Sequence, residues 1–178
     1  AANTVRVWQN IPVLGGDDAL DGLDPKTHGL VNAIGQMPKQ DRRQRLYEEC
    51  RDKGFSFPVL IHPFSWVADD TQLSDGVQLM AGAVIQPGCR IGANTIINTR
   101  ANIDHDCSIG VHVHIAPGAT LCGGVNIADN VFIGAGATVT QGIVIASGAM
   151  IGAGVACVRN VSPGEVIIGA PIRRNSRS

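Results

Sequence analysis

A period of six residues runs through half of this chain of 178 residues. From Ile61 to Ile151 every sixth residue is aliphatic, and no insertion interrupts the count. The series consists of Ile61, Val67, Leu73, Leu79, Ile85, Ile91, Ile97, Ile103, Ile109, Ile115, Leu121, Ile127, Ile133, Val139, Ile145 and Ile151. A second, generally smaller residue follows each member by four positions, giving Ser65, Thr71, Val77, Ala83, Cys89, Thr95, Ala101, Cys107, Val113, Ala119, Val125, Val131, Ala137, Ile143, Ala149 and Val155. An α-helix repeats every 3.6 residues and a half-buried strand every second residue, so the pattern indicates neither.

One large and one small inward position in each repeat describe a short strand followed by a corner. Three such sides close a triangular coil, so the chain returns above itself after three repeats. Stacked coils pair their backbones at about 4.8 Å, and the aliphatic side chains fill the prism that they enclose. Turn-forming residues stand at the expected corners, for example Pro87-Gly88, Pro117-Gly118 and Gly123-Gly124. The repeat therefore predicts an all-β solenoid, a parallel β-helix of about five coils over residues 61–160.

Composition and charge exclude several classes of function. A net charge of −1 gives no electrostatic reason to expect binding to nucleic acid or to an acidic membrane. No stretch approaches the ~20 apolar residues of a membrane span, and no signal peptide is visible. We therefore expect a cytoplasmic protein without a membrane span in this segment. The chain begins at Ala1 without a Met, as expected of a processed or shortened segment of a longer polypeptide.

The five cysteines are an odd number and form no Cys-x-x-Cys pair. Cys89 and Cys107 are three repeats apart in the small series, so they are expected to stack inside the prism. This usage favours reduced cysteines in the core of a cytosolic protein over a disulfide framework or a metal site.

Residues 1–60 lack the repeat and are expected to form a partial, Rossmann-like α/β domain. Short apolar segments in this region have strand-like composition, and residues 30–35 are expected to be a buried strand. Residues 41–51 predict a polar helix that Pro38 opens and Gly54 closes. The glycine-rich loop that usually follows the first strand of such a domain is absent.

The period fades at the other end of the chain, beyond Ile151. Residues 161–178 are therefore expected to form a C-terminal tail that is strand-like at first and leaves the prism.

Chemistry has to be sought at outward positions, because the inward ones are committed to packing. His105 comes two residues after Ile103, which is a corner position, and Asp106 is next to it. At the equivalent corner one coil above stand Gly123 and Gly124, which leave an open shelf with backbone N–H groups. A base of near-neutral pKa, a carboxylate and amide donors are what acyl transfer needs. The alternative from spacing alone is a tight corner beside an ordinary surface histidine.

Two runs of sequence carry a resemblance to a known family. Residues 98–110 read Asn-Thr-Arg-Ala-Asn-Ile-Asp-His-Asp-Cys-Ser-Ile-Gly, and residues 114–119 read His-Ile-Ala-Pro-Gly-Ala. They are similar to the sialic-acid and bacillosamine type of hexapeptide-repeat acetyltransferase (the NeuD/PglD type), and the resemblance extends over essentially the whole chain. It implies that the β-helix is left-handed and that the prisms form a homotrimer with the active site between neighbouring subunits.

The resemblance also implies roles for individual residues. His105 would be the general base that deprotonates a sugar amine, with Asp106 beside it. Asn98 and His114 fall on active-site positions, Asn98 with the catalytic residues and His114 with the cofactor contacts. The backbone amide of Gly123 would face the carbonyl of the thioester.

The implied co-substrate is acetyl-coenzyme A, with no metal. Ala135 and Ala153, which are three repeats apart on another corner, would contact it through the backbone, and Arg173 and Arg174 would meet its phosphates. The acceptor would be a nucleotide-linked amino sugar that enters from the N-terminal domain. Since the glycine-rich loop is absent here, the resemblance does not identify the nucleotide-binding residues.

The function expected from the sequence is N-acetyl transfer to the amine of a UDP-linked 4-amino-4,6-dideoxy sugar of the bacillosamine type, used in bacterial glycosylation. Transfer would be direct, because Cys107 points inward and no other residue is placed to form a covalent intermediate. Three alternatives remain open: a sialic-acid-type O-acetyltransferase, a γ-type carbonic anhydrase and a non-catalytic scaffold. The second would use His105, His112 and His114 as zinc ligands, although their spacing does not match the His-x-x-x-x-His of that family.

Overall fold

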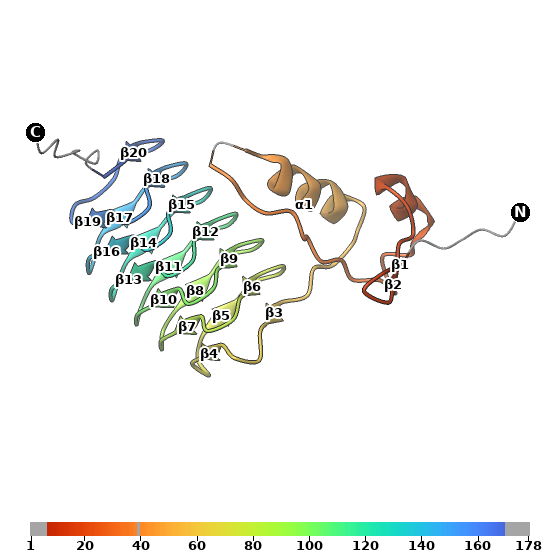
Figure 1. Cartoon of the computed structure of the whole chain (residues 1–178), viewed down its shortest axis with the longest axis horizontal. Coiled ribbons are helices and arrows are strands. Elements are labelled where there is room, and N and C mark those ends of the chain that lie inside the picture. Colours follow the sequence, from red (N-terminus) through yellow and green to blue (C-terminus); the bar gives the residue numbers. More distant parts are fainter. Residues whose placement is uncertain (1–6, 39, 170–178) are drawn as a thin grey trace, which may run out of the picture.

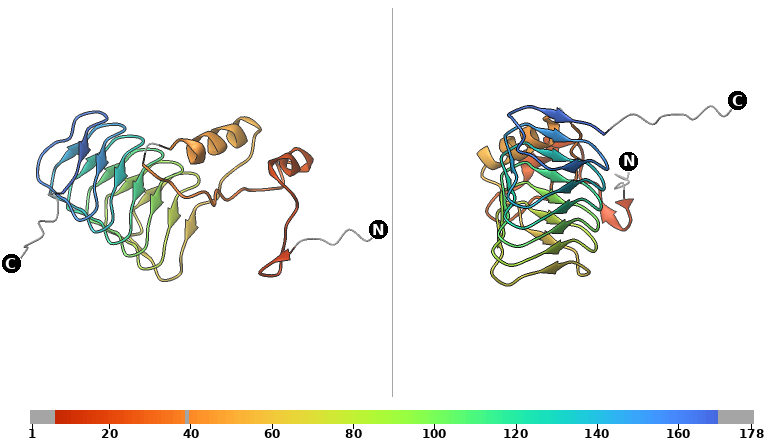
Figure 2. Two further views of the ribbon diagram at one scale, coloured as in Figure 1. Left: turned by 45° about the horizontal axis from the view of Figure 1, so that its top comes forward. Right: turned by 90° about the vertical axis from the view of Figure 1, so that its left-hand side faces the viewer.

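The computed structural model describes residues 7–38 and 40–169. It consists of a regular parallel β-solenoid that begins at residue 60, preceded by a small N-terminal region with one α-helix (Figure 1). The N-terminal region lies along one side of the coils and extends beyond the first of them (Figure 2). Within the described part of the chain, no helix is both long and apolar enough to cross a membrane.

The solenoid is built from strands of two residues each, separated by corners of four. They are β3 (Leu60–Ile61), β4 (Trp66–Val67), β5 (Gln72–Leu73), β6 (Gln78–Leu79), β7 (Val84–Ile85), β8 (Arg90–Ile91), β9 (Ile96–Ile97), β10 (Asn102–Ile103), β11 (Ser108–Ile109), β12 (His114–Ile115), β13 (Thr120–Leu121), β14 (Asn126–Ile127), β15 (Phe132–Ile133), β16 (Thr138–Val139), β17 (Val144–Ile145), β18 (Met150–Ile151), β19 (Ala156–Cys157) and β20 (Val166–Ile167). Every third strand pairs in parallel, which produces three sheets and confirms the triangular coil of three repeats.

We number the three sheets in the order in which the chain enters them. The first sheet contains β3, β6, β9, β12, β15, β18 and β20, the second β4, β7, β10, β13, β16 and β19, and the third β5, β8, β11, β14 and β17. Each corner is named by the sheets that it joins: corner 1–2, corner 2–3 and corner 3–1. Residues at the same corner and three repeats apart are therefore direct neighbours in adjacent coils.

The inward positions form the core as the period predicts. From Leu79 to Ile151 the aliphatic series is at most 3% exposed, and the small series is buried from Val77 to Val155 except at the half-buried Ile143. Cys89 and Cys107 are 0% and 1% exposed, which confirms that they stack inside the prism. The aliphatic ladder thus supplies the hydrophobic stabilisation of every coil except the open first one.

The solenoid is longer at its C-terminal end than the sequence predicted. The period fades after Ile151, but Val161 is buried and bridges Ile145 of the third sheet, and β20 pairs with β18 in the first sheet. The expectation of a tail that leaves the prism at residue 161 is therefore wrong as far as Ile167, and the solenoid has about six turns instead of five. The connection between β19 and β20, residues 158–165, is longer than the four residues of the other corners. A search for a period of six therefore does not detect this last coil.

The N-terminal region contains an antiparallel pair, β1 (Val7–Trp8) and β2 (Ile11–Pro12), a 3-10 helix (Asp17–Gly22) and α1 (Arg42–Asp52). The predicted polar helix is thus confirmed. Residues 30–35 form no strand; they run extended along the solenoid, and only the isolated bridge between Gly29 and Ser56 precedes them.

Contacts between this extended segment, α1 and the coils attach the N-terminal region to the solenoid. Gln36 Nε2 donates to the carbonyl of His112 at 2.7 Å, and Gln78 Nε2 donates to that of Asn32 at 2.8 Å. The ring of Tyr47 in α1 packs edge-on against His112, with centroids 5.7 Å apart. These contacts cover the outer face of the first sheet next to corner 3–1.

Candidate active site

The chemistry-bearing pair of the sequence lies at corner 2–3, just after β10. His105 Nδ1 and Asp106 Oδ2 are 2.9 Å apart, and Asp104 Oδ1 accepts the backbone N–H of His105 at 2.8 Å. A carboxylate only accepts hydrogen bonds, so Nδ1 of the neutral ring carries the proton and Nε2 has a free lone pair. Both side chains of the pair are exposed, which leaves Nε2 accessible to a substrate.

The same contacts set the basicity of the histidine. The hydrogen bond to Asp106 is the main cause that raises the pKa of His105 above its ordinary value, and the charge of Asp104 acts in the same direction. A histidine with a raised pKa is a stronger base but is neutral only at higher pH. The raised pKa thus makes the ring a stronger base than an ordinary histidine.

Gly123 provides the space into which the imidazole of His105 extends. A Cβ atom at Gly123 would lie 2.6 Å from Nε2 of that ring, so only glycine leaves room. The N–H of Gly124 donates to the carbonyl of His105 at 2.8 Å. Of the two amides of the expected shelf, the one at Gly124 is therefore used within the fold. The N–H of Gly123 has no acceptor among residues 7–38 and 40–169.

A second glycine, which the sequence reasoning missed, accommodates the carboxylate. A Cβ atom at Gly88, one coil below Asp106, would collide with Asp106 Oδ1. The signal was present in the sequence, because Gly88 precedes Asp106 by the same three repeats that separate His105 from Gly123. The pair is thus held between two positions without side chains, one below and one above.

Three other predicted site residues lie together at corner 1–2, at the opposite edge of the second sheet. Asn98 opens that corner in the coil of His105, and its Oδ1 accepts the N–H of Thr99 at 2.7 Å. Ala135 and Ala153 stand at the same corner in the coils above, both exposed. Within one chain, the structure therefore does not bring Asn98 or the two alanines to His105.

The two arginines expected to meet the cofactor's phosphates cannot be placed in the same way. Arg173 and Arg174 lie outside the described residues, which end at Gly169.

His114 lies on neither of these corners. It belongs to β12, on the outer face of the first sheet, where its ring stacks on Phe132 with centroids 5.1 Å apart and planes 10° from parallel. Burial, with a smaller effect of the nearby Arg43, lowers the pKa of His114 to about 4. In the triangular coil the first sheet is the side opposite corner 2–3, so His114 is remote from His105 of the same chain.

His112 occupies the third corner, 3–1, and is 7% exposed. Asn94 Nδ2 donates to its Nδ1 at 2.9 Å, its Nε2 is 3.6 Å from Glu48 Oε1, and burial lowers its pKa. The three histidines of the zinc alternative therefore stand on two corners and one face of a single chain. The described ranges contain no group of three or more His, Cys, Asp or Glu arranged to hold a metal ion.

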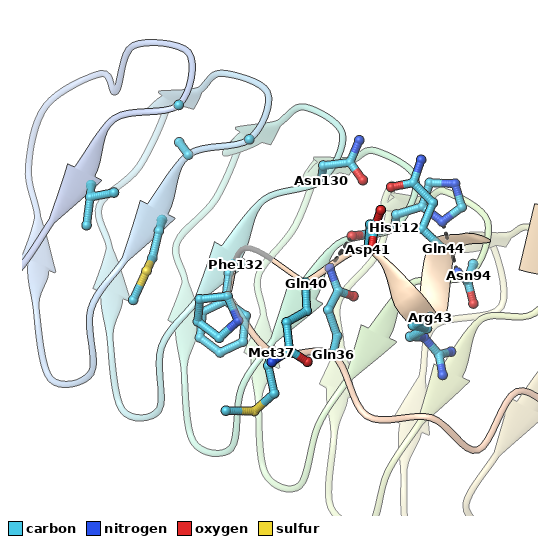
Figure 3. A pocket seen from close by; sticks show the side chains of 16 residues that line it. Gln36, Met37, Gln40, Asp41, Arg43, Gln44, Asn94, His112, Asn130 and Phe132 are labelled. Atoms are coloured by element: carbon cyan, nitrogen blue, oxygen red, sulfur yellow. Dashed lines mark hydrogen bonds between the residues drawn. The ribbon is translucent and has the colours of Figure 1, made fainter. Parts of the chain in front are cut away.

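A pocket lies where the N-terminal region meets corner 3–1 and the upper part of the first sheet (Figure 3). Amide side chains and apolar side chains line most of this pocket. The amides belong to Gln36, Gln40, Gln44, Asn94 and Asn130, and the apolar floor to Phe132 and Met150. Gln36 Oε1 and Asn94 Oδ1 are buried and have no hydrogen-bond partner within the described residues. This pocket is distinct from the His105 corner.

Comparison with known proteins agrees with this geometry. Residues 67–105 match the family described as "Bacterial transferase hexapeptide (six repeats)". A search among curated protein sequences gave no match.

Solved structures extend the likeness over nearly the full chain. The acetyltransferase domain of PglB from Neisseria gonorrhoeae FA1090 is 33% identical with a TM-score of 0.86, covering 95% of this chain and 82% of that one; it has also been solved in complex with acetyl coenzyme A. Perosamine N-acetyltransferase from Caulobacter crescentus, in complex with CoA and GDP-perosamine, is 36% identical with a TM-score of 0.81, covering 96% and 80%. WeeI from Acinetobacter baumannii AYE is 26% identical with a TM-score of 0.81, covering 94% and 80%.

A parallel solenoid of hexapeptide repeats with an exposed histidine–carboxylate pair beside a free backbone amide has the features of an acyltransferase. The identities to PglB and to perosamine N-acetyltransferase, which extend over almost the entire chain, define the group more closely. The chain belongs to the hexapeptide-repeat acetyltransferases.

Proposed function

We propose that this protein transfers the acetyl group of acetyl-coenzyme A to the amine of a nucleotide-linked amino sugar. The observation that carries the proposal is the orientation of His105, whose Nδ1 is held by Asp106 while Nε2 lies 2.6 Å from where a Cβ atom of Gly123 would stand. A general base and a residue with a free backbone amide thus meet at one exposed corner. The acetyl-CoA and GDP-perosamine complexes of the two relatives support this choice of substrates.

The reaction needs one proton acceptor and one donor to the oxyanion. As the neutral amine nitrogen of the sugar bonds to the thioester carbon, Nε2 of His105 accepts the proton that the nitrogen loses. The N–H of Gly123 donates to the oxygen that becomes negative in the tetrahedral intermediate. The carbon–sulfur bond then breaks, and the coenzyme A thiolate takes the proton from His105. No covalent bond to the protein forms.

Corner 1–2 is suited to hold acetyl-coenzyme A. Added Cβ atoms at Gly118, Gly136 and Gly154 meet nothing within 4 Å, so the column is an open ledge of backbone. The N–H groups of Ala135 and Ala153 have no acceptor within the described residues and are available to the pantetheine amides. This supports the two alanines as cofactor contacts.

The site requires two copies of the chain. His105 and the alanine ledge lie at opposite edges of the second sheet, so they do not form one shared groove within one chain. A homotrimer in which corner 2–3 of each copy faces corner 1–2 of the next would complete three identical sites, because a head-to-tail contact closes as a ring. Asn98, in the coil of His105, would then reach the neighbouring site at the level of the reacting groups.

The N-terminal region offers a pocket for the part of the acceptor that is remote from the amine. The pocket of Figure 3 joins the N-terminal region to the solenoid and presents amide groups over an apolar floor, which is chemistry that suits a hydroxylated ring.

The test is release of coenzyme A from acetyl-coenzyme A in the presence of three acceptors: a UDP-linked 4-amino-4,6-dideoxy sugar, its GDP-linked counterpart and free sialic acid. We expect turnover with an amino sugar, an N-acetylated product by mass spectrometry, and loss of turnover in His105→Ala. Turnover with sialic acid alone would replace the proposal by O-acetylation. Absence of acetyl-coenzyme A binding would contradict any acetyl transfer.

A further inference from the structure

Asp106 adopts a left-handed backbone conformation that glycine adopts at the same position in the neighbouring coils. The third residue of corner 2–3 has φ +77° at Gly88, +59° at Asp106, +68° at Gly124 and +67° at Gly142. This left-handed region favours glycine, and an aspartate there costs free energy that the fold must offset. Other corners of the solenoid also hold side chains in this conformation, at Asn94, Arg100, His112 and Asn130. The role of the Asp106 carboxylate is therefore argued from its contacts and not from its backbone.

The coil below determines where that carboxylate lies. Asp106 Oδ1 occupies the space that a Cβ atom at Gly88 would fill, while Oδ2 binds His105 Nδ1 at 2.9 Å. The two oxygens are rigidly linked, so displacing Oδ1 from Gly88 also moves Oδ2 away from the imidazole. Because the pair is exposed, no surrounding core restricts the carboxylate in place of this contact.

The backbone of Gly88 is itself held in an irregular way. At the same position in the coils above, the N–H donates to the carbonyl of the second corner residue one coil below, as Asp106 does to Pro87 and Gly124 to His105. The N–H of Gly88 instead donates to the side-chain Oδ2 of Asp70 at 3.0 Å. Asp70 thereby holds the backbone of Gly88, against which the Asp106 carboxylate lies.

We infer that Gly88 is a positioning residue for acetyl transfer: because it lacks a side chain, the Asp106 carboxylate can settle on the coil below and hold His105 with Nε2 facing the acceptor. The inference rests on the proposed function for its effect on turnover. Its effect on the histidine itself is independent of any activity. A side chain at Gly88 should weaken the Nδ1 hydrogen bond and so lower the pKa of His105.

The experiment compares Gly88→Ala with Gly54→Ala. Gly54 has φ +91° just after α1, away from the corners of the proposed site, and the nearest atom to an added Cβ there is 3.7 Å away, so this control places an alanine in the left-handed region without a collision. We expect the histidine NMR titration of Gly88→Ala to show a lower His105 pKa and kcat to fall about tenfold or more. In Gly54→Ala both should match the wild type.

A double-mutant cycle separates positioning from general disruption. If Gly88 acts through Asp106, Gly88→Ala combined with Asp106→Asn should be no slower than Asp106→Asn alone. Should Gly88→Ala fail to fold, Gly88→Asn and Gly54→Asn repeat the comparison, since asparagine tolerates the left-handed region. An unchanged His105 titration in the folded Gly88 variant would overturn the inference. A shifted titration with unchanged kcat would uphold the positioning and overturn the proposal that His105 is the base.

Discussion

The imidazole of His105 occupies the space that a side chain at Gly123 would fill, with Nε2 at 2.6 Å from the position of the missing Cβ atom. The two residues belong to successive coils and are three repeats apart. Glycine at this position therefore provides the space that the imidazole of His105 occupies, next to the residue whose backbone amide is free.

Gly123→Ala should for this reason impair catalysis while the solenoid remains folded. The added methyl group displaces the ring from the reacting atoms, and we expect kcat to fall by about 10²-fold, the effect of a displacement of ~1 Å. The measurement is steady-state kinetics together with thermal unfolding. Adding Gly123→Ala to His105→Ala should cause little further loss, and an independent additional loss would show that Gly123 acts apart from the ring.

His105→Ala should reduce turnover by about 10²–10⁴, the range for removal of a general base. The side chain is exposed, so the unfolding midpoint should stay close to that of the wild type. His28→Ala, at an exposed position of the N-terminal region, is the control and should be fully active. Near-normal turnover in His105→Ala would exclude this histidine as the base.

Asp106→Asn should move the pH profile as well as lower the rate. The carboxylate raises the pKa of His105, so its loss lowers that pKa and keeps the imidazole neutral to more acidic pH. The acid limb of kcat/KM should therefore shift to lower pH, and the maximal kcat should fall because the ring is less basic and less well oriented. A profile that shifts to higher pH, or not at all, would contradict the role of this hydrogen bond.

Bulk at the alanine ledge should interfere with the cofactor and not with the acceptor. Ala135→Leu fills the open corner 1–2 of the proposed interface, and we expect KM for acetyl-coenzyme A to rise roughly tenfold, about 1.4 kcal/mol. Ser147→Leu places the same side chain at the matching position of corner 3–1 and should leave that KM unchanged. Equal effects of the two variants would contradict the assignment of the ledge.

The buried His114 should make stability depend on pH. Its pKa is about 4 in the folded state and ~6.5 when unfolded, so the unfolded chain binds a proton that the folded chain does not. Stability is then fully present above pH ~6.5 and is lost as the pH falls toward 4, by up to about 3 kcal/mol for this residue. Denaturant unfolding of His114→Phe should show a smaller decline over this range; a decline equal to that of the wild type would contradict it.

The regularity of the solenoid explains why so much of it follows from sequence. In stacked coils, every contact between neighbours is a contact between residues three repeats apart, so spacing along the chain gives position in space. The inward ladder, the stacked cysteines and the approach of Gly123 to His105 were all predicted on this basis. Gly88 obeys the same rule and was missed only because the spacing was counted upward from the histidine.

Contacts that do not repeat could not be predicted in this way. The burial of His114 depends on Phe132 and on Arg43 of α1, which approaches across a non-repetitive segment. The final coil closes through Val161 and β20 after an irregular corner, and so escaped a count in sixes.

What the sequence determined by itself is the prism, together with the position of Gly123 one coil above His105, because a period of six leaves one way to bury the aliphatic series. Only the tertiary structure decided which corners and faces the site residues occupy. It placed His105, the alanine ledge and His114 on different sides of the triangle, since each repeat turns the chain onto a new face. The direction of the Asp106 carboxylate likewise depends on packing against Gly88, a contact between coils that no local preference specifies.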